Sequence, residues 1–144
     1  MRLQIPAMIL CGALAASAWP APAEISVKDY CEATLKASEV AELEWKDRIS
    51  VAQSHQGTAK ALDIKLRALD VAYGGLRNQL YAHYGTTFQD YLRFGASHQS
   101  AIKLYLEQNV GVSGTMNDVS ARIQSLRRQM ESLMAARQVP ETRK

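Results

Sequence analysis

Apolar residues recur three and four positions apart over long stretches of this chain, which is the spacing that places them on one face of an α-helix. The clearest stretch covers residues 59–83, and a second covers residues 116–138. Gly74 and Gly75 fall inside the first, where a bend or a close helix crossing would account for them. The positions with strict heptad spacing are Ala59, Leu62, Leu66, Leu69, Tyr73, Leu76, Leu80 and His83 in the first stretch, and Met116, Val119, Ile123, Leu126, Met130 and Leu133 in the second.

A third long helix is predicted over residues 26–55. Its apolar face consists mostly of small residues, with Trp45 as the one large member. Ser26 is a suitable N-cap because Asp29 follows three positions later. Gly57 marks a tight turn to the next helix, and so short a loop between two long helices indicates an antiparallel hairpin.

Between the two heptad stretches the helical pattern is interrupted. It predicts a short helix over 88–94 that Gly95 stops, a further segment over 98–109, and a flexible loop over 109–114 ahead of Thr115 as the next N-cap. Strand-type alternation of apolar and polar residues is absent. The sequence therefore predicts an all-α fold, an antiparallel bundle of three long helices plus a short broken helical segment.

The segment before this helical region, residues 1–23, has the parts of a secretory signal peptide. An arginine near the start supplies a positive charge, residues 7–16 form an apolar run, and Ala21 and Ala23 are the small residues that a signal peptidase reads. The run is too short to span a bilayer, which needs about 20 apolar residues. We expect cleavage after Ala23, export to the periplasm or the extracellular space, and a single domain over residues 24–144.

Two other ways of processing this segment compete with cleavage after Ala23. Ala16-Ser17-Ala18 offers a second cleavage site. Cys11 followed by Gly12 suggests lipid attachment, but Leu10 is larger than the residue that usually precedes a lipidated cysteine. Cleavage after Ala23 is therefore the interpretation that the sequence favours.

Charge is distributed unevenly along the chain. Residues 24–47 carry seven acidic and three basic side chains, a net charge of −4, whereas residues 122–144 carry six basic and two acidic ones, a net charge of +4. Loss of residues 1–23 removes one arginine and lowers the net charge from +3 to +2, so nothing indicates nucleic acid as a partner. We expect the acidic first helix to lie beside the basic last helix; a basic patch for a membrane surface is the alternative.

Residue types that carry chemistry are few and scattered. Cys31 is the one cysteine left after cleavage, which excludes a disulfide framework, a cysteine-based zinc site and haem attachment. We expect it to be buried or to form an intermolecular disulfide. His55, His83 and His98 lack metal-ligand spacing, so we expect no metal and no cofactor. No nucleophile motif or phosphate-binding loop occurs, and we expect that the protein is not an enzyme.

Aromatic residues and histidines are concentrated between residues 73 and 105. The candidate ligand-binding residues in this window are Tyr73, Tyr81, His83, Tyr84, Phe88, Tyr91, Phe94, His98 and Tyr105. They could line a pocket for an aromatic or lipid-like ligand. The other interpretation is a small core that seats the broken segment on the end of the helical hairpin, because aromatic residues at helical spacing commonly pack on one another.

These patterns favour a non-enzymatic binding or assembly module of the cell envelope, which engages a protein partner or a second copy of itself through helix faces. The alternative is a small-ligand carrier with an aromatic pocket formed by residues 73–105. A structure can separate the two. A carrier has a concave apolar cavity in that window, whereas an assembly module exposes an apolar stripe on a long helix.

Overall fold

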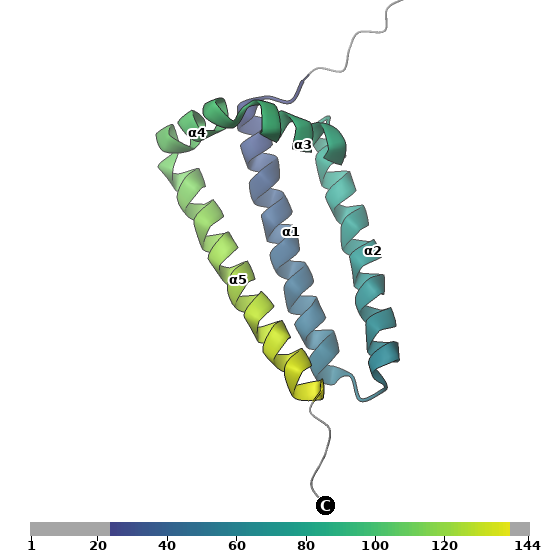
Figure 1. The fold of residues 1–144 in the computed structure, drawn as a ribbon. Helices are drawn as coiled ribbons and strands as arrows, with labels where there is room; N and C mark the ends of the chain where they lie inside the picture. The colour runs from purple at the N-terminus through teal and green to yellow at the C-terminus, as the bar shows by residue number, and fades with distance from the viewer. Residues whose placement is uncertain (1–23, 139–144) are drawn as a thin grey trace, which may run out of the picture.

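The computed structural model describes residues 24–138, which form helices joined by short connections (Figure 1). In chain order the helices are α1 (Val27–Ser54), α2 (Ala59–His83), α3 (Phe88–Ser97), α4 (Gln99–Gln108) and α5 (Val110–Gln138). The predicted all-α class is confirmed. The predicted signal peptide over residues 1–23 lies outside the described residues.

Helix α1 is the centre of the fold, with α5 packed on one side and α2 on the other (Figure 1). Contacts at two levels show that α5 runs parallel to α1. Arg122 donates to the Glu42 carboxylate at 3.0 Å. Further along α5, Arg137 donates to the carbonyl of Ala52, which is also further along α1. This is the direction that an alternating series of three long helices requires, because its first and third members run the same way.

Helix α2 runs antiparallel to α1, as the short connecting loop predicts. Asp70 forms an ion pair with Arg48, and Arg77, later in α2, donates to Glu44, which is earlier in α1. The parallel direction of α5 follows from the path of α3 and α4. These two helices carry the chain across the end of the molecule where α1 begins, so α5 starts beside the start of α1 (Figure 1).

Two hydrophobic clusters hold the long helices together. The loop-end cluster lies near the α1–α2 connection and joins all three long helices through buried Ile49, Ala52, Leu62 and Met130, with Trp45, Val51, Leu66, Leu126, Leu133 and Met134 packed around them. The aromatic cluster lies at the other end, where Ala33, Tyr81 and Tyr91 are buried among Tyr30, Ala37 and Tyr84. Both heptad stretches contribute to the loop-end cluster, but the first does so only in its first half, since Leu76 is 48% exposed and Ala59 and His83 are exposed as well.

Between the two clusters, α1 contacts its neighbours through charged side chains. The buried carboxylate of Glu42 accepts from Arg122 of α5 and lies 2.7 Å from the Lys46 ammonium nitrogen. Glu44 faces the other way and accepts from Arg77 of α2 at 2.5 Å. Carboxylates two positions apart on a helix point in different directions, and each side of α1 therefore presents one acid to one neighbouring helix.

Side chains cap the starts of the first three helices, and the predicted cap Ser26 is confirmed. The side-chain oxygens of Ser26, Thr58 and Thr87 each accept from the backbone N–H three residues later, which satisfies one of the free donors of α1, α2 and α3. After α2, Gly85 adopts a positive φ of 69°, a conformation open to glycine, and the chain turns there toward α3.

The predicted loop over 109–114 is wrong, because α5 begins at Val110. Thr115 is not a cap; its hydroxyl donates to the carbonyl of Gly111 at 2.9 Å, inside the helix. A threonine can bond backward in this way within a helix as well as forward at its start, so the residue itself does not mark the boundary. Helix α3 likewise runs through Gly95, where the sequence predicts its end, to Ser97.

Candidate functional site

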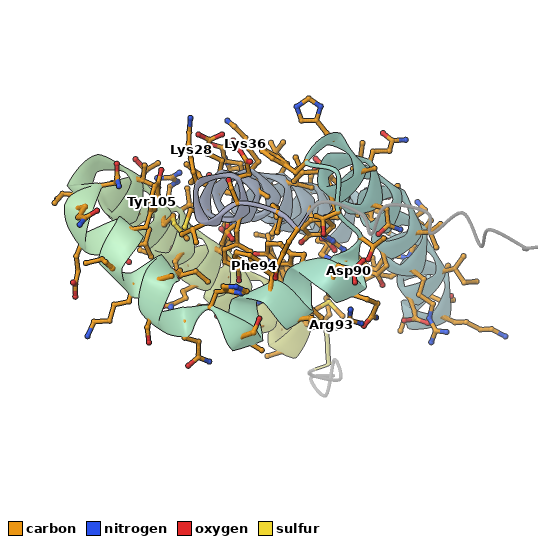
Figure 2. All side chains as sticks on the ribbon, turned by 90° about the horizontal axis from the view of Figure 1, so that it is seen from above. Lys28, Lys36, Asp90, Arg93, Phe94 and Tyr105 are labelled. Carbon is orange, nitrogen blue, oxygen red and sulfur yellow. The ribbon has the colours of Figure 1, made fainter. Side chains whose placement is uncertain are left out.

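Six aromatic rings contact one another in a continuous series where α3 crosses the start of α1. Neighbouring ring centroids lie between 4.0 and 5.6 Å apart, in the order Phe88, Tyr81, Tyr91, Tyr30, Phe94 and His98. Figure 2 looks down on this end of the molecule and shows Phe94 between α3 and α1. The structure thus brings together five of the nine predicted site residues, and Tyr84 packs beside them.

Tyr30 joins the two halves of this series, although it was not among the predicted site residues. Its ring stacks on Tyr91 with centroids 4.6 Å apart and lies 5.3 Å from the ring of Phe94. Sequence reasoning grouped the aromatic residues by closeness along the chain, and Tyr30 in α1 lies far outside that window. The signal that points to it is Gly95, a glycine inside a helix whose missing side chain leaves room for the Tyr30 phenol.

Polar atoms in the aromatic cluster find partners within it. The hydroxyls of Tyr91 and Thr34 lie 2.7 Å apart in a hydrogen bond, and burial raises the pKa of Tyr91 well above its usual range. The Nδ1 atom of His98 lies 3.1 Å from the carbonyl oxygen of Phe94. Rings that contact in series, with their polar atoms bonded locally, fit the predicted small core better than a pocket.

Three predicted site residues lie away from this series. The Tyr73 hydroxyl donates to Asp47 at 2.5 Å, further down α2, and this bond, with burial and the nearby carboxylates, raises the pKa of Tyr73 to about 12. His83 is exposed and meets the edge of Tyr84. Figure 2 shows Tyr105 on the α4 side, away from Phe94. The structure therefore does not unite the nine residues in one site.

An open groove of about 460 Å³ lies beside the aromatic cluster, between α4 and the start of α5. Its lining residues are Tyr30, Gly95, Gln99, Ile102, Lys103, Leu106, Glu107 and Ser113. Ile102 and Leu106 give it an apolar floor, while Lys103 and Glu107, whose charged groups are 3.8 Å apart, stand at its exposed edge. The groove shares only part of its lining with the window of residues 73–105.

An exposed apolar stripe runs along the side of α2 that faces away from α1. We call it the outer stripe; it consists of Ile64, Ala68, Val71, Gly75 and Ala82, spaced four, three, four and seven positions apart, all of them exposed. Its two large members, Ile64 and Val71, are 60% and 78% exposed. Apolar side chains aligned on one free helix face are the feature that an assembly module needs.

The reactive and metal-binding types of side chain in the described residues have structural roles. Cys31 is 1% exposed, and burial raises the pKa of its thiol, which disfavours the reactive thiolate. His55 is buried beside the α1–α2 loop, with Nε2 3.0 Å from the Thr58 carbonyl oxygen. Across residues 24–138, no three histidine, cysteine or acidic side chains gather in a way that could hold a metal ion.

The basic side chains of α5 are used mostly against α1. Besides the ion pair of Arg122, Arg127 lies over the ring of Trp45, with its guanidinium carbon 5.3 Å from the centroid. Arg137 donates to the carbonyl of His55 at 2.6 Å, as well as to that of Ala52, so it caps the end of α1. The acidic first helix and the basic last helix therefore lie side by side, as the charge pattern predicts.

In comparisons with models of protein families, with curated proteins and with solved structures, none matches this chain. Among residues 24–138, no helix combines the length and the apolar character that crossing a membrane requires.

Proposed function

We propose that this protein is a non-enzymatic binding or assembly module, exported to the cell envelope, that engages a protein partner through a helix face. The observation that carries this proposal is the outer stripe of α2. Among residues 24–138, Val71 is the most exposed of the large apolar side chains at 78%, and Ile64 lies two turns away on the same face. Keeping such side chains in water forgoes hydrophobic stabilisation, and a partner that covers them recovers it.

The start of the fold is compatible with export and with cleavage after Ala23. Ile25 is buried and Ser26 caps α1. A cut after Ala23 leaves both residues on the mature chain, so cleavage would keep the packing of Ile25 and the cap of α1. The mature protein would then be one helical domain, with α1 at its centre.

Catalysis has little support in the geometry. The buried acids Glu42 and Glu44 are both bonded to basic side chains, and hydrogen bonds from Arg122 and Lys46 lower the pKa of Glu42. A carboxylate that stays ionised between cations is a poor proton donor near neutral pH. These acids serve better as links between α1 and its neighbours.

A second candidate function, a carrier of a small apolar ligand, draws support from the groove between α4 and α5. Its volume of about 460 Å³ falls within the range of small-molecule sites. The groove is open to solvent, however, and the aromatic rings expected to line a pocket mostly contact one another. We therefore rank this function second.

Site-specific photocrosslinking in intact cells tests the proposed function. A photoreactive residue replaces Val71 in one variant and Leu104, a 54% exposed residue of α4, in a matched control. We expect specific protein adducts from position 71 and not from position 104. Equal labelling at the two positions, or no adduct at position 71, would refute the proposal.

A further inference from the structure

The outer stripe of α2 lies opposite the residues that hold α2 in the fold. Leu62 and Leu66 pack inward in the loop-end cluster. Val71 is nine positions after Leu62, which is two and a half helical turns and places it on the opposite side of α2. The contacts of α2 with α1 and α3 therefore leave this side uncovered.

Gly75 in the outer stripe has no explanation within a single copy of the chain. Helix α2 runs unbroken through it, and a Cβ at this position would meet no other heavy atom within 4 Å. Its φ is not positive, so the backbone conformation does not require glycine. Although glycine lowers helix stability, its missing side chain leaves room on this face for a neighbour that approaches α2 closely from outside.

The outer stripe is complementary to itself when it is reversed. In an antiparallel pair of α2 helices with a two-fold axis between residues 69 and 70, Ile64 of one copy faces Gly75 of the other, and Val71 faces Ala68. Each large side chain then meets a small one, as knobs meet holes. A parallel pair would instead place Ile64 against Ile64 and leave the two Gly75 positions facing each other.

Charge favours the same antiparallel direction. Lys60 and Lys65 are exposed beside the first half of the outer stripe, together with the ion pair of Arg67 with Asp63. The exposed side chains beside the second half, Asn78, Gln79 and His83, carry no fixed charge. An antiparallel pair places the basic half of one helix against the uncharged half of the other, whereas a parallel pair would bring like charges together, which is unfavourable.

We propose that this chain forms a dimer through the outer stripes of two antiparallel α2 helices. The proposal rests on the proposed function and names the partner, a second copy of this chain. The same few residues supply both the large side chains and the spaces that receive them, which is what the self-complementary contact of a two-fold dimer requires. The dimer would cover Ile64 and Val71 in both copies.

Sedimentation of the exported chain, made with residues 1–23 in place and purified from the cells, tests the dimer. We expect a concentration-dependent dimer for the wild type. Val71→Asp buries a carboxylate in the contact and should weaken self-association by at least tenfold, whereas Leu104→Asp, the same kind of change at an exposed residue of α4, should not change it. A monomeric wild type, or equal effects of the two substitutions, would overturn the proposal.

Disulfide trapping tests the direction of the pair. A mixture of Ile64→Cys and Gly75→Cys chains should form a mixed disulfide, because these positions face each other in the antiparallel pair. Ile64→Cys alone should trap little, since the two copies of that residue lie about 16 Å apart along the helix axes. Efficient trapping of Ile64→Cys alone would overturn the antiparallel dimer. Wild-type chain, treated alike, controls for disulfides through Cys11 or Cys31.

The failure of the dimer and the failure of the proposed function are distinguishable. A monomeric purified chain that still gives photocrosslinks from position 71 to a different envelope protein refutes the dimer and leaves the proposed function standing. A monomeric chain with no adducts from position 71 refutes both. Circular dichroism melts of Val71→Asp and Leu104→Asp should match that of the wild-type monomer, which would show that the changes act on association and not on folding.

Discussion

The phenol of Tyr30 in α1 occupies the space that a side chain at position 95 of α3 would fill. A Cβ on Gly95 would lie 3.0 Å from Tyr30 Cζ and closer still to the hydroxyl oxygen. Real Cβ atoms do not tolerate such contacts. Because Tyr30 stacks on Tyr91 and lies against Phe94, the close approach at Gly95 sets how α3 crosses α1 and so positions the aromatic cluster.

Gly95→Ala should therefore destabilise the protein. The new methyl group displaces the Tyr30 ring or lifts α3 from α1, and overpacking of this kind costs about 1–3 kcal/mol. This exceeds the gain of about 1 kcal/mol from replacing glycine by alanine in a helix. Urea unfolding of the two proteins, followed by circular dichroism, measures the difference in the free energy of unfolding.

Gly74→Ala is the matched control for this change. Gly74 also lies inside a helix, but a Cβ there would meet no other heavy atom within 4 Å. It should stabilise the protein by up to about 1 kcal/mol. Effects of the same sign for Gly74→Ala and Gly95→Ala would show that Tyr30 does not fill the space beside Gly95.

The contact between Tyr30 and Gly95 also shows which part of the fold the sequence pattern could not predict. Helical spacing predicted the long helices and the inward faces that include Leu62 and Met130, because periodicity is a local property. The crossing of α3 over α1 is not local. It depends on a contact between residues far apart in the chain, so the sequence could gather the aromatic residues of one window and still omit Tyr30.

The boundary at the start of α5 was missed for another physical reason. Gly111 and Gly114 resemble a loop because glycine is a poor helix former, and Thr115 resembles a cap. Packing of α5 against α1 and α4 outweighs these weak local preferences, as tertiary contacts commonly do. The path of α3 and α4 across the end of α1 was likewise outside the reach of local pattern, since it depends on contacts with α1.

Three of the six tyrosines should ionise at a higher pH in the folded protein than in the unfolded chain. The hydrogen bond to Asp47 raises the pKa of Tyr73 to about 12, and burial raises the pKa of Tyr81 and of Tyr91. In the unfolded chain these groups ionise near pH 10. Stability conferred by their neutral forms is thus complete below pH 10 and is lost as the pH rises through the folded pKa values.

Phenolate absorbance during alkaline titration checks this prediction. The native protein should show delayed ionisation relative to the same protein in denaturant, and Tyr73→Phe should remove one delayed group. A native titration curve that coincides with the unfolded one would contradict the placement of these three hydroxyls.

The charged contact between α1 and α5 should make stability fall in acid. Hydrogen bonds from Arg122 and Lys46 lower the pKa of Glu42 below its unfolded value of about 4.3. The ionised carboxylate therefore contributes stability that is fully present above that pH and is lost as the pH falls through the folded pKa. Glu42→Gln should cost about 1 kcal/mol near neutral pH, because exposed Arg122 can still be hydrated.

Urea unfolding of Glu42→Gln near pH 7 and near pH 3 measures this effect. The difference between variant and wild type should shrink at the lower pH, because the Glu42 carboxyl is then protonated in the unfolded wild-type chain and protons compete with its ion pairs in the folded one. Glu131→Gln, an exposed change on α5, is the control and should follow the wild type at both values. A cost for Glu42→Gln that is equal at the two values would mean that the charge of Glu42 is not what links α1 to α5.

Aspartate substitutions at Leu62 and Ile64 should have very different effects on stability, because these residues lie on the inner and the outer face of α2. The two residues are two positions apart in one helix, yet Leu62 is 2% exposed in the loop-end cluster and Ile64 is 60% exposed. Leu62→Asp would bury an unpaired carboxylate, which costs several kcal/mol and is comparable to the whole stability of a domain of this size.

We therefore expect Leu62→Asp to abolish cooperative thermal unfolding, measured by circular dichroism. Ile64→Asp makes a change of the same kind at the exposed position, so at concentrations where the chain is monomeric its melting temperature should stay within a few degrees of the wild type. Helix propensity cannot produce this contrast, because both variants place aspartate in the first two turns of the same helix. If both variants unfold, or both melt like the wild type, then α2 does not pack on α1 through its Leu62 face.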